Sequence, residues 1–365
     1  MAHIAIFRRR FVEKEGLLTD AEYASLVALC QVIPGPASSQ VGMALGYRLG
    51  GLLGALLAWF AFTLPSAVLM GIGAYLWLSG EFVELGWVIV ALKLVALGIV
   101  TQAVIGMWQS LCVEHSAKVI ALIAAVLFYI EPTAWVQLGM IAAALVAGDI
   151  KARQAALESF EVKTQSLSLG LGCVAVVVIG VALSALLPGE SGLWHIISGH
   201  FVSGALVFGG GHVVLPLLQA EFVPPLSEAG FLAGYGLAQA MPGPLFTLAS
   251  YLGGLSWTEA PWLGALVATL AIFIPGALLL AGAALVGHSL LPWLKARILW
   301  VNAVVVGLLA SVLVNPIFTE SVTSEVTTGL GMLSLLIAVV LKRSPLELVG
   351  IMVIATFGVA QMGWL

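Results

Sequence analysis

The chain has 365 residues, of which 61% are hydrophobic and only 9% are charged, and its 14 basic and 18 acidic residues give a net charge of −4. Soluble domains carry roughly 25% charged residues, so this composition excludes an ordinary soluble protein and indicates a chain that lies mostly in lipid. No basic block suggests nucleic acid binding. With about 20 residues to a membrane span, the length allows roughly ten crossings.

The first half opens with an amphipathic stretch and then shows a broken apolar helix. A helix of about a dozen residues ends at Pro34, a Pro-Gly-Pro sequence interrupts it, and a second short helix runs to about Gly50. Proline lacks a backbone donor and clashes with the preceding turn, so the interruption must end one helix before another starts. Four more apolar segments follow at about 52–79, 87–112, 118–131 and 133–148.

A long polar run, 149–166, separates the halves. We therefore divide the chain into an N-terminal transporter repeat (1–148), a polar linker with a linking helix (149–192) and a C-terminal transporter repeat (193–365). The apolar segments beyond the polar run lie at about 167–187, 193–209, 231–255, 262–287, 298–316, 326–341 and 346–363, and the third of them is again broken by Pro-Gly-Pro.

An internal repeat appears when the second half is shifted by 208 to 210 residues onto the first. Gln31 and the break Pro34-Gly35-Pro36 then fall on Gln239 and the break Pro242-Gly243-Pro244. Three further matches occur in order: His3 with His212, Leu64–Ala67 with Ile274–Ala277, and Ala96–Gly98 with Val305–Gly307. Transporters commonly contain such repeats and bind their substrate between them.

The charges at the ends of the long spans differ between the halves. Arg8–Arg10 open the first half and Glu81 follows its long span, whereas Glu221 lies early in the second half and Lys295 follows its long span. Because Lys and Arg collect on the cytoplasmic side, this exchange favours inverted repeats. We therefore predict an all-α, polytopic membrane bundle of two related, inverted repeats, each with a helix broken at Pro-Gly-Pro. The number of crossings stays open, because each broken segment fits either one discontinuous span or a re-entrant hairpin.

The broken helices are the candidate substrate site. Irregular backbone at membrane depth is tolerated only where protein or a water-filled cavity surrounds it. The start of each second half-helix presents unpaired N–H groups and the positive end of a helix dipole, which favour an anion. A kink without function is the alternative, which two matching copies make less attractive. The residues that we predict to bind substrate are Gln31, Pro34, Gly35, Pro36, Ser38, Ser39, Gln239, Pro242, Gly243, Pro244, Thr247 and Lys93.

Four basic side chains in or near apolar segments have two interpretations each. Lys93 lies within a span, where a charge is costly and often functional, but it could instead extend to the interface. Arg48 either attracts anions or anchors the end of a half-helix. His3 and His212, matched by the repeat, form either a titratable pair that couples proton movement to transport or two structural, hydrogen-bonded histidines. We expect no metal ion and no cofactor.

Three stretches resemble the two signatures of the chromate ion transporter (CHR) family. The first is AHIAIFRRRFVEKEGLLTDAEYASLVALCQVIPGPASSQVGMALGYRLGG, and the second half carries FGGGHVVLPLL and AQAMPGPLFTLASYLGG. The resemblance implies a multi-pass protein of the bacterial or archaeal inner membrane, of the long two-domain type, that exports chromate and gives chromate resistance. Family members usually have a further apolar helix before the first histidine, so we expect a late start or a truncation at Met1.

The leading hypothesis is therefore secondary transport of chromate by rocking of the two halves about a central site. The alternatives are a carrier for sulfate or another tetrahedral oxyanion, an anion channel, and a membrane-embedded hydrolase. The chain lacks the GxxxxGK[ST] motif and the HExxH motif, and we expect no enzymatic activity. The expected partners are chromate or sulfate and the lipid bilayer, with a homodimer left open and no nucleic acid.

Overall fold

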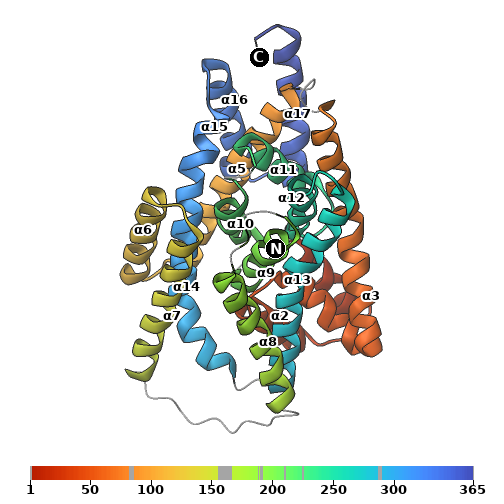
Figure 1. The fold of residues 1–365 in the computed structure, drawn as a ribbon, viewed down its shortest axis with the longest axis vertical. Coiled ribbons are helices and arrows are strands. Elements are labelled where there is room, and N and C mark those ends of the chain that lie inside the picture. The colour runs from red at the N-terminus through yellow and green to blue at the C-terminus, as the bar shows by residue number, and fades with distance from the viewer. Residues whose placement is uncertain are drawn as a thin grey trace.

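The computed structural model (Figure 1) describes residues 2–81, 86–154, 167–187, 189, 192–208, 211–223, 226–286 and 290–364. Residues 155–166 of the polar run lie outside these ranges, so the structure describes the predicted linker at 149–154 and in its linking helix. Every element in the described ranges is helical, which confirms the all-α membrane bundle.

The first half contains six helices in the described ranges, and a π-helical turn, Arg9–Lys14, continues the first of them. They are α1 (Ala2–Arg8), α2 (Asp20–Val32), α3 (Ala37–Leu78), α5 (Gly86–Leu111), α6 (His115–Ile130) and α7 (Ala134–Gln154). The predicted break between α2 and α3 is confirmed. Helix α7 continues six residues beyond the boundary that we placed at residue 148.

The linking helix is α8 (Leu167–Leu186); the second half then begins with α9 (Gly192–Leu206) and repeats the pattern of a broken helix and long spans. The following helices are α10 (Val214–Phe222), α11 (Glu228–Ala240), α12 (Leu248–Ser256), α13 (Pro261–Val286), α14 (Leu290–Val312), α15 (Thr319–Ser321), α16 (Glu325–Leu335) and α17 (Pro345–Gln361). Helix α14 starts at Leu290, eight residues before the predicted 298. The prediction starts late because Lys295 and Arg297 lower the hydropathy of the first turns, although they do not interrupt the helix.

Each broken helix is followed by a tight hairpin of helices. Within α3, Gly50 and Gly51 have non-helical backbone angles, and Gly51 has a φ of 61°. A Cβ atom on Gly46 would lie only 2.3 Å from the carbonyl oxygen of Gly54, so the chain doubles back there and the two arms touch. In the second half, a Cβ atom on Gly253 of α12 would lie 2.4 Å from the carbonyl oxygen of Gly264 in α13. The predicted end of the first half-helix at about Gly50 is therefore confirmed.

The two halves exchange their last helices. Helix α5 of the first half packs against α16 and α17, while α14 of the second half packs against α6 and α7 (Figure 1). The matched glycines make these contacts close: a Cβ atom on Gly98 would lie 2.4 Å from Ser334 Oγ, and one on Gly307 would lie 2.2 Å from the carbonyl oxygen of Ala121. Each half therefore completes its packing with the end of the other.

Five helices in the described ranges are long and apolar enough to cross a membrane, and five shorter apolar helices accompany them. The most apolar parts of α3 and α8 are only 11% buried within the protein. Their outward leucine, valine and phenylalanine side chains form the surface expected to face lipid.

Candidate anion site at the two broken helices

The first break is held in place by the second half of the chain. Gly35 has a φ of 125°, which favours glycine, and its N–H donates to the carbonyl oxygen of Val207, one residue past α9, at 2.8 Å. A Cβ atom on Gly35 would lie 2.8 Å from Cα of Gly276 in α13. The break therefore needs glycine for its backbone conformation and for its contact with α13.

Gln40 joins the same two segments. Its Nε2 donates to the carbonyl oxygens of Pro34 at 2.9 Å and Gly276 at 3.0 Å, and the side chain is fully buried. Both hydrogen bonds stabilise the irregular backbone that proline creates, because a buried carbonyl without a donor is costly. Gln40 thus fixes the start of α3 against α13.

The second break packs on the first half in the reciprocal way. Gly243 has a φ of 156°, and a Cβ atom on it would lie 2.2 Å from Ser66 Oγ in α3. Ser66 follows Pro65, as Gly276 follows Pro275 in α13, and the repeat matches these two pairs. Ser250, in α12, donates from Oγ to the carbonyl oxygen of Ala67 at 2.7 Å. Each Pro-Gly-Pro break therefore packs against the proline-containing helix of the other half.

The two helix starts differ in their free donors. Helix α3 begins after Pro36, which provides no side-chain cap, and the first N–H to be bonded is that of Gln40, to the carbonyl oxygen of Pro36 at 2.9 Å. Ser39 Oγ is buried without a partner among the described residues. In the second half, the 3₁₀ turn Leu245–Thr247 precedes α12, and Thr247 donates from both N and Oγ1 to the carbonyl oxygen of Pro244.

The predicted glutamines lie before the breaks, at the ends of α2 and α11. Gln31 is exposed, whereas Gln239 is half-buried and its Nε2 is buried without a partner among the described residues. Pro242 is exposed and Ser38 is half-buried. The structure brings the first-break residues together at the start of α3, and it places Gln31 on the outer face of α2.

Lys93 is in an ion pair that the sequence did not reveal. Its Nζ lies 2.8 Å from Glu320 Oε2 in α15, and the Lys93 side chain is only 14% exposed. Ser321 Oγ donates to the carbonyl oxygen of Lys93 at 3.0 Å, which fixes the same segment. The charge of Lys93 is therefore balanced by a carboxylate of the other half, and its predicted role in anion binding stays a prediction. The two residues lie 227 positions apart in the sequence, so the residues near Lys93 do not indicate the pair.

The two matched histidines have different environments. The His3 ring packs edge-on against Phe62 of α3, with the ring centroids 5.0 Å apart. His212 Nδ1 lies 2.8 Å from the hydroxyl oxygen of the buried Tyr235 in α11. A role in proton coupling stays a prediction for both.

Arg48 pairs with Glu22 at 2.8 Å, which joins the end of the half-helix in α3 to the start of α2. Both side chains are about half exposed, so the pair is a surface contact of small energetic weight. This arrangement matches the anchoring interpretation of Arg48, and the attraction of anions stays untested.

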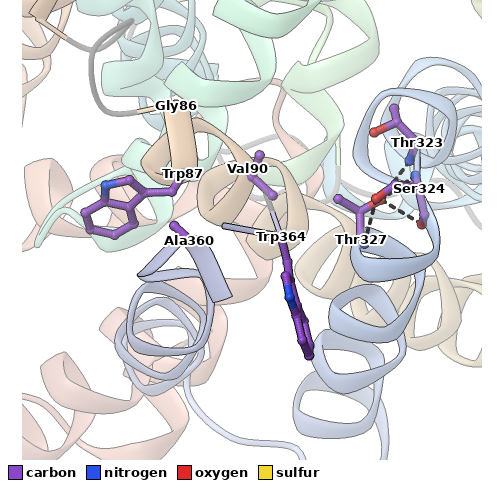
Figure 2. A pocket seen from close by; sticks show the side chains of 8 residues that line it. All are labelled: Gly86, Trp87, Val90, Thr323, Ser324, Thr327, Ala360 and Trp364. Carbon is purple, nitrogen blue, oxygen red and sulfur yellow. Dashed lines mark hydrogen bonds between the residues drawn. The ribbon is translucent and has the colours of Figure 1, made fainter. Parts of the chain in front are cut away.

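The two cavities described lie away from the breaks. The larger, about 610 Å³, opens between the start of α5, the start of α16 and the end of α17 (Figure 2). One of its polar groups is engaged, because Thr327 Oγ1 accepts from the backbone N–H groups of Thr323 and Ser324. The smaller, about 120 Å³, is lined by Phe128, Tyr129, Pro132, Gln219, Ala220, Val223, Glu228, Ser311 and Asn315. Neither is lined by a residue of the breaks, so the shared cavity that the sequence predicts stays a prediction.

Comparisons with known proteins agree with one another. The family model described as "Chromate transporter" matches residues 1–148 and 194–362. A "Chromate transport protein" of Pseudomonas aeruginosa is 26% identical over 291 residues, which cover 75% of this chain and 66% of that protein. One of Cupriavidus metallidurans is 26% identical over 292 residues, or 73% of this chain and 65% of that protein.

An uncharacterized transporter of the archaeon Methanocaldococcus jannaschii is 23% identical over 291 residues, which cover 76% of this chain and 69% of that protein. The chain thus spans about two thirds of the length of these curated relatives. No solved structure matches it.

Proposed function

This chain belongs to the chromate transporter family, and on that premise we propose that it carries chromate out of the cytoplasm as a secondary transporter and so gives chromate resistance. It is a multi-pass protein of the bacterial plasma membrane, as its family and the five long apolar helices of the described ranges indicate. Its curated relatives described above are named as transporters or transport proteins.

The observation that carries the proposal is the reciprocal packing of the two breaks. Gly35 lies against Gly276 of the second half, and Gly243 lies against Ser66 of the first. Repeats related by an approximate two-fold axis produce such exchanged contacts, and transporters place their substrate where such repeats meet. The reciprocity supports a repeat interface at the breaks, with inverted repeats as the arrangement that we propose.

The chemistry of the breaks suits an oxyanion. Unbonded N–H groups at a helix start favour negative charge, and the start of α3 carries no side-chain cap. Chromate and sulfate are both tetrahedral dianions, so this geometry alone does not separate them. Sulfate is therefore the competitor against which the proposal has to be tested.

The test is uptake of labelled chromate by inverted membrane vesicles. We compare the wild-type chain with Pro34→Ala and Pro242→Ala, and we use Pro345→Ala, at the exposed start of α17, as the matched proline control. We expect saturable, gradient-dependent uptake by the wild-type chain and by the control, and strongly reduced uptake by both break variants.

Three results would contradict this proposal in different ways. Normal uptake by both break variants would place the substrate site elsewhere. Uptake of labelled sulfate without uptake of chromate would make the chain a sulfate carrier. Uptake that neither saturates nor responds to collapse of the ion gradient would indicate a channel.

A further inference from the structure

The two breaks are related by the repeat, but their donors are not equally available. Resting on the proposed function, we infer that the oxyanion is held at the first break alone, by the hydroxyl groups of Ser38 and Ser39 and the N–H groups at the start of α3. The second break is a structural joint between the halves.

The start of α3 retains its hydrogen-bond donors. The N–H groups of Ala37, Ser38 and Ser39 have no backbone partner among the described residues, because the first bonded N–H is that of Gln40. Ser39 Oγ is buried, with the side chain 1% exposed, and also has no partner there. A buried hydroxyl group without a partner is destabilising, so a ligand that accepts a hydrogen bond from it would recover this loss.

The side chain of Gln40 lies at the same site, at the start of α3. Its amide lies directly across the break, since a Cβ atom on Gly35 would be 2.8 Å from Nε2. The two carbonyl oxygens that accept from Nε2 fix the orientation of the amide, and Oε1 is buried without a partner among the described residues. A hydrated or protonated oxyanion can donate to Oε1. Two independent side chains thus present unpaired polar atoms at the start of one helix.

The hydroxyl donors of the second break are already in use. Thr247 gives its N–H and its hydroxyl to the carbonyl oxygen of Pro244, and Ser250 gives its hydroxyl to Ala67 in the other half. Leu248 takes the position that the repeat assigns to Gln40, so this break lacks the amide. The N–H groups of Leu245 and Phe246 have no backbone partner among the described residues, but no unpaired hydroxyl group accompanies them. Gln239 Nε2 is also unpaired among those residues, and it lies before the break on α11 rather than at the start of a helix.

Neither nearby cation supplies the charge for this site. Arg48 is eleven residues along α3 from Ala37, or about 16 Å at 1.5 Å per residue, and it pairs with Glu22. Lys93 pairs with Glu320. The binding site therefore consists of neutral dipoles, which hold an anion without a fixed counter-charge that would slow release of the anion.

The test uses the purified full chain and measures chromate binding by equilibrium dialysis together with the apparent melting temperature. Ser39→Ala should raise the Kd by roughly tenfold or more, because hydrogen bonds to charged groups are worth about 1.5–3 kcal/mol. It should leave the melting temperature unchanged or higher, since Ser39 Oγ has no partner to lose among the described residues. Ser250→Ala, the matched control at the second break, should lower the melting temperature and leave the Kd within about twofold.

The opposite pattern would overturn the inference. A Kd that Ser39→Ala leaves unchanged would show that this hydroxyl does not touch the anion, and a loss of affinity in Ser250→Ala equal to that in Ser39→Ala would show that both breaks bind it. Failure of the wild-type chain to bind chromate at all would instead overturn the proposed function, and this inference with it.

Discussion

The contact between Gly243 and Ser66 gives the sharpest prediction of how the halves are joined. In Gly243→Ala, the new Cβ atom would lie 2.2 Å from Ser66 Oγ and 2.7 Å from Ser66 Cβ. Ser66 cannot move easily, because it is fully buried and donates to the carbonyl oxygen of Thr63 at 3.1 Å. Overpacking of this kind costs about 1–3 kcal/mol.

The backbone adds a second cost. A φ of 156° is rarely adopted by residues other than glycine, and a strained backbone of this kind costs of order 1–3 kcal/mol. The sum is about 2–6 kcal/mol, which corresponds to roughly 4–12 °C in melting temperature at about 2 °C per kcal/mol. The assay is thermal unfolding of the purified chain in detergent, compared at one scan rate.

Two further variants separate the two costs. Ser66→Gly combined with Gly243→Ala removes both clashing atoms and gives Ser66 the residue found at the matched Gly276, so it should recover the steric part. Gly80→Ala isolates the backbone part, because Gly80 has a φ of 83° and nothing lies within 4 Å of its Cβ position. A double variant no more stable than Gly243→Ala alone would refute the reasoning, as would a Gly243→Ala protein as stable as the wild-type chain.

Three other outcomes are expected. Lys93→Met should cost about 1–3 kcal/mol by removing the cation that pairs with Glu320, and the double variant with Glu320→Gln should regain most of it; an additive double variant in thermal unfolding would contradict the pairing. Gly307→Ala places a Cβ atom 2.2 Å from a backbone oxygen of α6 and should cost about 1–3 kcal/mol, whereas Gly106→Ala, with nothing within 4 Å, should be neutral or stabilising. Tyr23→Phe loses the 2.6 Å hydrogen bond to the backbone of α1, so hydrogen exchange in α1 should rise while the global melting temperature changes little.

The sequence predicted the features that depend on local chemistry. Proline placed the break at Pro34–Pro36, because it cannot continue a helix, and the glycine pair at Gly50 predicted the end of the half-helix. Composition predicted the membrane class, and the shift between the halves identified the matched glycines Gly98 and Gly307. These features depend on residues close together in the chain, or on a comparison of the chain with itself.

The sequence did not predict the partners of these features. Nothing near Lys93 indicates Glu320, and nothing near Gly35 indicates Gly276, since both contacts join the halves across more than two hundred residues. For the contact between Gly35 and Gly276, the available signal was the match of Pro65-Ser66 with Pro275-Gly276 in the repeat. It showed that the two pairs are equivalent, but an equivalence does not say that each lies against the break of the other half.

The exchange of final helices between the halves has a consequence for biosynthesis. The face of α5 that carries Gly98 packs against α16 and α17, which are synthesised more than two hundred residues after it. Until they insert, the first half has a long span with an uncovered flank, so it cannot mature as an independent unit in the way that N-terminal domains often do. We expect assembly to be a late, single event that involves the whole chain, and partial synthesis products to be targets for membrane proteases.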